Sequence, residues 1–391
     1  MIPLDRQILE NDGTMVISDR KGPTVRLLAV GDLAFHGKAL ETMGRESPQY
    51  ILEPVRELIR TADLVVGNLE SVLVKAPYSP LSSKACLVSG LEALEGLEDA
   101  GFDVLTFANN HILDAGPEGL VECLEGLQAA GFHTTGAGRT ATEARVPVTF
   151  EVGDFRFRFH AYCYGQGQIA GPRNPGCNEA NLKTILKDLL EFKQENDIPV
   201  VCLHMDAEFQ ATPAPDRMEM CHKLAEAGVP IILCHHPHVP QGIEVHQGSL
   251  IVYSLGNYVF PILPYMRENS TECAMSFHIE VFVDLHGPVK AIVVPVSIDQ
   301  DGRPIPATGS ERKELLQLIA HRSKLLTDPD EVAGRYRQMV KKYTQQMGKN
   351  IYWSIGERNW GMIKTRLNEW SKSPTKRAWV RHYFLGLLSR R

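Results

Sequence analysis

The feature that most constrains the fold is a short apolar run at residues 229–233 that ends in a histidine-rich loop. The run Val-Pro-Ile-Ile-Leu is followed by Cys234, His235, His236, Pro237 and His238. A continuous apolar run of this length is typical of a buried strand. Imidazoles at the end of such a strand suit a divalent metal, because ligands bind at the carboxyl edge of α/β sheets. The stretch therefore predicts a buried strand that leads into a metal-binding loop.

Four earlier apolar runs end in the same way. They lie at residues 25–30, 63–66, 102–107 and 199–203. The polar side chains that follow these runs are Asp32, Glu70, Asn110, His111 and His204. Segments with helical spacing separate the runs, which favours strands that alternate with helices. We therefore expect the polar side chains to gather where the strands end.

Two other segments have a different pattern. Residues 149–164 and 274–296 alternate apolar and polar side chains around a glycine-containing turn, as antiparallel hairpins do. Strands alternating with helices, followed by mostly antiparallel strands, predict a layered two-sheet α/β sandwich at residues 25–305. Residues 1–24 then form an N-terminal lead-in, and residues 306–391 form a helical C-terminal extension.

The C-terminal extension differs in charge from the rest of the chain. From residue 311 onward, 18 Lys and Arg residues stand against 7 Asp and Glu residues, a net charge of +11 that leaves −17 for residues 1–310. Residues 370–391 mix basic and aromatic side chains. They predict either a helix that binds an anionic membrane surface or polyanionic substrate, or a helix docked on the acidic main domain. No nucleic-acid recognition motif accompanies the charge, so we expect no nucleic-acid partner.

The N-terminal segment favours a cytoplasmic protein. Residues 1–24 carry Asp5, Glu10, Asp12 and Asp19 and have no apolar run of signal-peptide length. We therefore expect a cytoplasmic location, peripheral at the membrane if the basic extension binds lipid headgroups.

The polar residues at the strand ends suit divalent metal ions. Carboxylate, amide oxygen and imidazole ligands together favour ions of intermediate hardness such as Mn²⁺, Fe²⁺ or Zn²⁺, and one carboxylate can bridge two ions. Two ions about 4 Å apart could polarise a phosphoryl or carbonyl oxygen and generate hydroxide at neutral pH. Seven isolated histidines are instead expected to be structural, namely His133, His160, His222, His246, His278, His286 and His321.

Further polar residues near the strand ends have two interpretations each. Glu208 is either a solvated acid or a contact to the substrate or to a metal ligand. His235 either supports the metal ligands or turns the loop that carries them. Ser254 and Asn257 either stabilise the turn between them or face the substrate.

Six short segments follow the apolar runs in a distinctive order. They are Gly-Asp at 31–32, Asn-Leu-Glu at 68–70, Asn-Asn-His at 109–111, His-x-x-x-Glu at 204–208, His-His-Pro-His-Val at 235–239 and Tyr-Ser-Leu-Gly-Asn at 253–257. In this order they resemble the CapA family, the poly-γ-glutamate capsule biosynthesis proteins. That family belongs to the calcineurin-like metallophosphoesterase superfamily. The resemblance therefore implies a metallophosphoesterase-like fold that binds two metal ions.

The resemblance also implies a role for each residue. Asp32 and His238 would bind the first metal, and Glu70 would bridge the two metals. The second metal would be bound by Asn110, His204 and His236. His111 would be the acid/base histidine, held close to the bond that breaks and oriented by Asp114.

The first motif departs from the superfamily pattern Asp-x-His. Asp32 is separated from the next histidine, His36, by three residues. Either His36 substitutes from an altered loop, or the first metal lacks one ligand. Glu70 also stands where the superfamily has an aspartate, and the longer side chain changes the bridge between the metals.

The chain is therefore predicted to be a metal-dependent hydrolase or transferase that acts on a phosphate ester or amide bond in capsule polymer or peptide metabolism. A metal-activated hydroxide would attack, with His111 as acid/base. A metal-dependent epimerase or isomerase that abstracts a proton at an α-carbon would use the same residues. A non-catalytic accessory protein of a poly-γ-glutamate synthase is a third interpretation. The substrate would be a small molecule, a peptide or a polymer.

Overall fold

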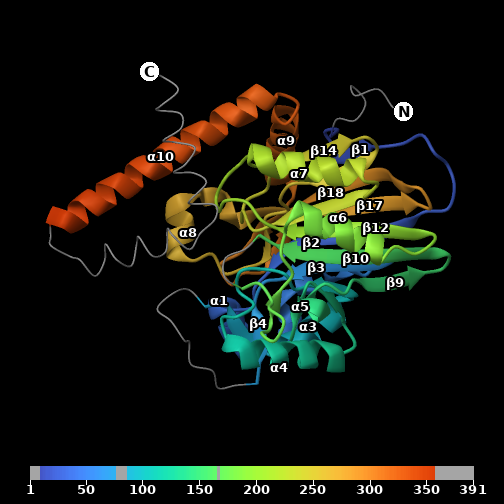
Figure 1. Ribbon diagram of the computed structural model, residues 1–391, viewed down its shortest axis with the longest axis horizontal. Helices are drawn as coiled ribbons and strands as arrows, with labels where there is room; N and C mark the ends of the chain where they lie inside the picture. The colour runs from blue at the N-terminus through green and yellow to red at the C-terminus, as the bar shows by residue number, and fades with distance from the viewer. Residues whose placement is uncertain (1–8, 76–85, 165–167, 357–391) are drawn as a thin grey trace.

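Two large β-sheets and the helices around them make up the structure, a computed structural model that describes residues 9–75, 86–164 and 168–356 (Figure 1). The first sheet contains the strands β1 (Thr14–Val16), β2 (Val25–Leu33), β3 (Leu64–Leu69), β6 (Val104–Thr106), β7 (His133–Thr135), β16 (Asn257–Val259), β17 (Met275–Asp284), β18 (Gly287–Ile298) and β19 (Pro304–Pro306). Its order is β1-β18-β17-β2-β3-β6-β7, with β16 beside β2 and β19 beside β18. The strands β2, β3, β6 and β7 run parallel, whereas β17 and β18 form the predicted antiparallel hairpin.

The second sheet contains the strands β9 (Val148–Val152), β10 (Phe155–Cys163), β12 (Asp197–His204), β13 (Ile231–His235), β14 (Ile243–His246) and β15 (Ser249–Val252). Its order is β14-β15-β13-β12-β10-β9. The hairpin of β9 and β10 is as predicted, but the four central strands, β10, β12, β13 and β15, are parallel. The prediction of mostly antiparallel strands after the first sheet was therefore wrong for this sheet.

The helices are α1 (Gly37–Arg45), α2 (Glu53–Ile59), α3 (Ala93–Ala100), α4 (Gly116–Ala129), α5 (Ala141–Ala144), α6 (Leu182–Glu191), α7 (Pro215–Glu226), α8 (Pro264–Asn269), α9 (Gly309–Leu325) and α10 (Pro329–Gly356). Two 3₁₀ helices, η2 (Pro48–Ile51) and η3 (Thr271–Ala274), and two small strand pairs complete the described elements. The pairs are β4 (Val72–Val74) with β5 (Val88–Gly90), and β8 (Ala137–Gly138) with β11 (Gly176–Cys177).

Burial on both faces explains why the central strands of the second sheet are parallel. Ile231 and Leu233 of β13 point into the core shared with the first sheet. Ile232 and Cys234, which alternate with them, pack in a separate core with residues of α6 and α7, the helices that cover the outer face (Figure 1). A strand buried on both faces is apolar throughout and is connected to its parallel neighbour by a covering helix.

The C-terminal extension, which was predicted to be helical, begins with α9 and α10. Helix α10 is the long helix that extends across one side of the molecule (Figure 1). The basic segment 370–391 lies outside the described residues. In the described part of the chain, no helix is both long enough and apolar enough to cross a membrane.

A close approach of two backbones positions one corner of the first sheet. A Cβ atom at Gly31 would lie only 2.0 Å from the carbonyl oxygen of Gly256. The same oxygen accepts a hydrogen bond from the N–H of Asp32 at 3.0 Å. The contact places Asn257 opposite Asp32 in the parallel pairing of β16 with β2. Only glycine fits at residue 31. The close backbone approach brings Asp32 of β2 beside Asn257 of β16.

Candidate metal centre

Three polar atoms converge where β6, β12 and β13 end. The Nε2 atom of His204 lies 2.7 Å from Oδ1 of Asn110 and 3.1 Å from Nδ1 of His236. His204 is the last residue of β12, and it pairs with His235 of the neighbouring strand β13. His236 follows with φ of 98°, a strained conformation for a residue other than glycine that turns its ring toward His204.

Glu70, directly after β3, lies at the middle of this group. Its side chain is fully buried, and neither carboxylate oxygen has a hydrogen-bond partner among the described residues. The Nε2 atoms of three histidines surround its Oε1, at 3.6 Å for His204, 3.9 Å for His111 and 4.0 Å for His238. Burial, followed by the charges of Asp32 and Glu208, raises the pKa of Glu70 well above its usual value.

Asn257 determines which nitrogen of His238 carries a proton. The amide Nδ2 of Asn257 donates to the carbonyl oxygens of Cys273, at 3.0 Å, and His238, at 3.4 Å. Its Oδ1 therefore faces Nδ1 of His238 at 2.9 Å and must accept a proton from it. The Nε2 atom of His238 is left with a free lone pair on the side of Glu70.

Asp32 is held by donors from several elements. Its Oδ1 accepts a hydrogen bond from Nδ2 of Asn68 at 2.8 Å, and its Oδ2 accepts one from the backbone N–H of His236 at 3.3 Å. The Nδ1 atoms of His235 and His238 lie 3.3 and 3.7 Å from the same carboxylate. Burial alone would raise the pKa of Asp32, but His235, followed by His204 and His238, lowers it below its usual value.

His111 and Asp114 form a pair at the edge of the centre. The Nδ1 atom of His111 lies 2.7 Å from Oδ2 of Asp114, which also accepts a hydrogen bond from the backbone N–H of Leu87 at 2.8 Å. The carboxylate therefore holds the proton of His111 on Nδ1 and turns Nε2 toward Glu70. Both side chains of the pair are 19% exposed, so this histidine can exchange protons with solvent.

The sequence analysis missed two buried asparagines of the site. Asn68 bridges Asp32 and Nδ1 of His204, which lies 3.2 Å from its Nδ2. Asn109 donates to the carbonyl oxygen of Leu69 at 2.7 Å and accepts from the backbone N–H of His111 at 3.0 Å. Strand alternation was the available signal for Asn68, because it stands two residues before Glu70 and so shares its side of the chain.

His36 lies close to the centre without joining it. Both ring nitrogens are buried and have no hydrogen-bond partner among the described residues, and the ring packs edge-on against Phe260 at 5.4 Å. Burial lowers the pKa of His36 to about 4. Within the described ranges, no carboxylate oxygen lies within 4.0 Å of its ring nitrogens, so its role as a ligand of the first metal stays a prediction.

The remaining candidates differ in position. Ser254 accepts from the backbone N–H of Gly256 at 3.2 Å, which is the turn-stabilising role. Glu208 is exposed, and its negative charge acts to raise the pKa of both Glu70 and His236. His235 is buried beside Asp32, in the supporting position considered for it.

The residues of the centre fit a divalent cation. Ring nitrogens of His204 and His236 and the amide oxygen of Asn110 converge on one point, and the buried Glu70 adds a carboxylate that no donor among the described residues satisfies. The ligand atoms of Glu70, His236 and His238 all lie within 4.8 Å of one another. Buried charges and converging lone pairs are costly unless a cation compensates them. The donor set of imidazole, carboxylate and amide oxygen is the one that Mn²⁺, Fe²⁺ and Zn²⁺ accept.

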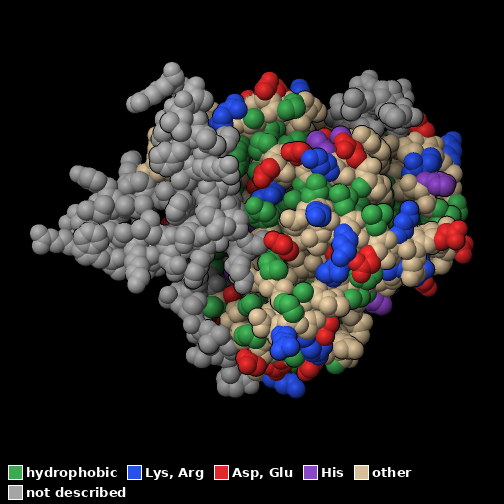
Figure 2. Space-filling view, in the orientation of Figure 1, with side chains coloured by type: hydrophobic (Ala, Val, Ile, Leu, Met, Phe, Trp, Pro, Cys, Tyr) green, Lys and Arg blue, Asp and Glu red, His purple; other side chains and the backbone are tan. Residues whose placement is uncertain are grey.

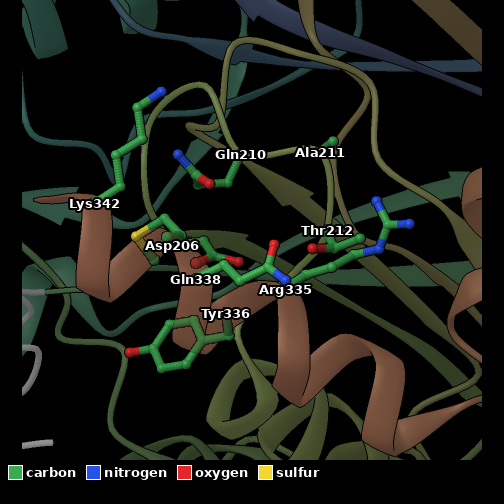
Figure 3. A pocket seen from close by; sticks show the side chains of 9 residues that line it. Asp206, Gln210, Ala211, Thr212, Arg335, Tyr336, Gln338 and Lys342 are labelled. Atoms are coloured by element: carbon green, nitrogen blue, oxygen red, sulfur yellow. The ribbon is translucent and has the colours of Figure 1, made fainter. Parts of the chain in front are cut away.

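Two hollows are lined in part by the loop that follows β12. The smaller one is lined by Asn110, Tyr164, His204, Asp206 and His236, among others. The larger one lies between the loop that follows β12 and helix α10, and it is lined by Gln210 and Thr212 of the loop and by Arg335 and Lys342 of the helix (Figure 3). Asp206 lines both hollows.

Comparisons with known proteins agree with the motif order. Residues 26–262 match the family described as "Bacterial capsule synthesis protein PGA_cap". The "Capsule biosynthesis protein CapA" of Bacillus anthracis is 27% identical over 75% of this chain and 72% of its own length. The "PGA biosynthesis protein CapA" of Bacillus subtilis is 28% identical over 73% of this chain and 74% of its own length. A "Probable polyglutamine synthesis accessory protein" of Mycobacterium tuberculosis is 28% identical over 40% of this chain and 44% of its own length.

Proposed function

The chain belongs to the bacterial capsule synthesis protein family PGA_cap, and from this premise we propose that it is a metal-dependent hydrolase or transferase of polymer synthesis. The bond on which it acts would be an amide or a phosphate ester. The names of its Bacillus relatives, which refer to capsule and PGA biosynthesis, support a polymer or one of its precursors as the substrate.

Six residues would hold the metal ions. They are Asp32, Glu70, Asn110, His204, His236 and His238, as the motif order implies. A divalent ion bound there supplies a Lewis acid that polarises the bond to be broken and acidifies water. Glu70 would bridge the two ions. Its Oε1 lies between a proposed ligand of each ion, 3.6 Å from Nε2 of His204 and 4.0 Å from Nε2 of His238. Its buried, unpartnered carboxylate is the single observation that carries the proposal.

His111 would move the proton of the reaction. With Nδ1 bonded to Asp114, its Nε2 atom can accept a proton from an attacking group or deliver one to a leaving group. The same Nε2 faces Glu70 at 3.9 Å, so it is directed into the centre rather than into solvent. Asp114 would act as a positioning residue that fixes the tautomer and orientation of the ring.

The hollow beside α10 supports a substrate that is longer than the reacting group. Arg335 and Lys342 line it from the helix, and Gln210 and Thr212 line it from the loop (Figure 3). Both carboxylate oxygens of Asp206 accept backbone hydrogen bonds, at 2.8 and 2.9 Å, so its charge is partly satisfied there. Arg335 also pairs with Glu331 at 2.7 Å, so Lys342 and the amide of Gln210 are the groups that suit a carboxylate of an anionic peptide or polymer.

Turnover by His111 variants tests the proposal. The full chain, loaded with Mn²⁺ or Zn²⁺, is assayed with an aryl phosphate ester and with a γ-glutamyl peptide. We expect His111→Asn to lower kcat by about 10²- to 10⁴-fold with metal content unchanged, because a positioned acid/base typically contributes that factor. His321→Asn, at an exposed position of α9, is the matched control. Unchanged kcat in His111→Asn at saturating metal would refute its role.

A non-catalytic accessory role is the second candidate, and the name of the Mycobacterium relative favours it. The two candidate functions predict different effects of His111→Asn on polymer production in cells. If the protein is an enzyme, cells that carry only His111→Asn should lose polymer production. If the chain acts only as a binding accessory, the same cells should make polymer at the normal level.

A further inference from the structure

A second group of histidines and carboxylates lies where helix α7 meets the edge strand β14. His222 and Glu226 are four residues apart on α7, so they share one face of the helix. Glu244 and His246 are two residues apart on the edge strand β14, so they share one face of the strand. Figure 2 shows histidine and acidic side chains together at the surface over α7 and β14. None of the four residues belongs to the centre around Glu70.

The four side chains contact one another across the two elements. Nε2 of His222 lies 3.0 Å from Oε2 of Glu244, and Nε2 of His246 lies 3.6 Å from Oε1 of Glu226. Each helix residue is thus paired with a strand residue, a crossed arrangement of two imidazoles and two carboxylates. The ligand atoms of His222, Glu244 and His246 all lie within 4.8 Å of one another.

Tyr253 supports the group from behind. This tyrosine is buried, and its hydroxyl donates a hydrogen bond to Oε2 of Glu244 at 2.8 Å. The hydroxyl also lies 3.5 Å from Nε2 of His222. A hydrogen bond of this kind to a carboxylate fixes its orientation, as the residues around metal ligands commonly do. The Nε2 atom of His246 is buried and has no hydrogen-bond partner among the described residues.

The rings need one adjustment before they can share an ion. The imidazoles of His222 and His246 are stacked, with centroids 4.1 Å apart and planes only 7° apart, so their lone pairs run side by side. To share one ion, one ring would rotate about its Cβ–Cγ bond. That torsion has broad minima in histidine, and both rings are partly exposed.

We propose that His222, Glu244 and His246, with Glu226 as a fourth ligand, form a binding site for one Zn²⁺ ion that joins α7 to β14. Two imidazoles and one or two carboxylates are a common ligand set for zinc. The ion would connect an edge strand of the second sheet to the helix that covers that sheet. It would therefore stabilise the fold rather than take part in the reaction, and the inference does not depend on the proposed function.

Zinc binding to the metal-stripped full chain tests this site. The variants are His222→Asn/His246→Asn and, as the matched control, His321→Asn, which changes an exposed histidine of α9 outside the group. Zinc alone is titrated by calorimetry, and the bound metal is counted after dialysis. We expect the control and the unaltered chain to bind one more zinc ion per chain than the double variant. Equal zinc content in all three proteins would overturn the proposal.

Hydrogen exchange keeps the proposal testable if the double variant fails to fold. In the unaltered chain, zinc at ten times its dissociation constant should slow local opening of α7 and β14 by roughly tenfold, because an ion that binds only the closed form reduces opening in proportion to its occupancy. Exchange in α7 and β14 that is unchanged by zinc would overturn the proposal.

Discussion

Glu70→Gln should make the metal-free protein more stable and the metal-loaded protein less so. The carboxyl group of Glu70 is fully buried and has no donor among the described residues, and its pKa is raised by burial and by the charges of Asp32 and Glu208. Its folded-state pKa therefore exceeds the unfolded-state value. The folded protein binds more protons, so its stability falls as the pH rises through the interval between the two values.

The magnitude follows from the length of that interval. Each pH unit above the usual glutamate pKa of 4.5 lowers the free energy of unfolding by about 1.36 kcal/mol, for as long as the carboxyl group stays protonated in the folded protein. Between pH 5 and pH 7 the unaltered chain should therefore lose unfolding free energy relative to Glu70→Gln, at up to this rate for each pH unit. Buried histidines such as His278, whose pKa is lowered to about 3, have the opposite pH dependence but are common to both proteins.

Urea unfolding of both proteins measures this difference. The chelator-treated proteins are unfolded at several values between pH 5 and pH 8, and the two free-energy curves are subtracted. The same experiment is repeated with Mn²⁺ at one hundred times its dissociation constant, which should stabilise the unaltered chain by about 2.7 kcal/mol and Glu70→Gln by much less. Parallel pH profiles and equal stabilisation by metal would refute the reasoning, because Glu70 would then be an ordinary buried side chain.

Two further substitutions test how the centre is built. Asn257→Leu removes the acceptor that holds the proton of His238 on Nδ1, and we expect roughly 10- to 100-fold weaker metal binding by calorimetry, as is typical when a partner of a metal-binding histidine is lost. Gly31→Ala places a Cβ atom 2.0 Å from the carbonyl oxygen of Gly256 and should destabilise the fold by about 1–3 kcal/mol in thermal unfolding, whereas Gly44→Ala, with open space around it in α1, should not lower stability.

The residues at the ends of parallel strands were predictable from the sequence. An apolar run that ends in a polar residue marks the carboxyl end of a strand, and such ends lie together at one edge of a sheet. This argument selected Glu70, Asn110, His204 and His236, which the structure brings within a few ångströms of one another. Their chemistry as metal ligands stays a proposal.

The contact of Asn257 with His238 was harder to predict because it depends on strand register. Asn257 meets His238 only because β16 pairs with β2 next to the Gly31 contact, and no local pattern specifies that pairing. The direction of the second sheet was missed for a related reason. A short apolar run fits a buried parallel strand or a hairpin equally well, and the covering helices decide between them.

The group on α7 and β14 illustrates the same limit. The sequence contains His222 and Glu226 at helical spacing, and Glu244 and His246 at strand spacing. Each pair taken alone is common on a protein surface, so the histidines were interpreted as structural. The structure adds that the two faces meet, which is a tertiary property that spacing cannot reveal.

Metal content is the measurement that tests the central claim most directly. Elemental analysis is carried out on the dialysed full chain and on His236→Asn/His238→Asn, which removes two ligands of the Glu70 centre. The account predicts that the unaltered chain retains Mn, Fe or Zn at this centre, with two ions per chain if Glu70 bridges them. The double variant should lose this metal. Equal metal content in the two proteins, or none in either, would contradict the claim that these strand ends form a metal centre.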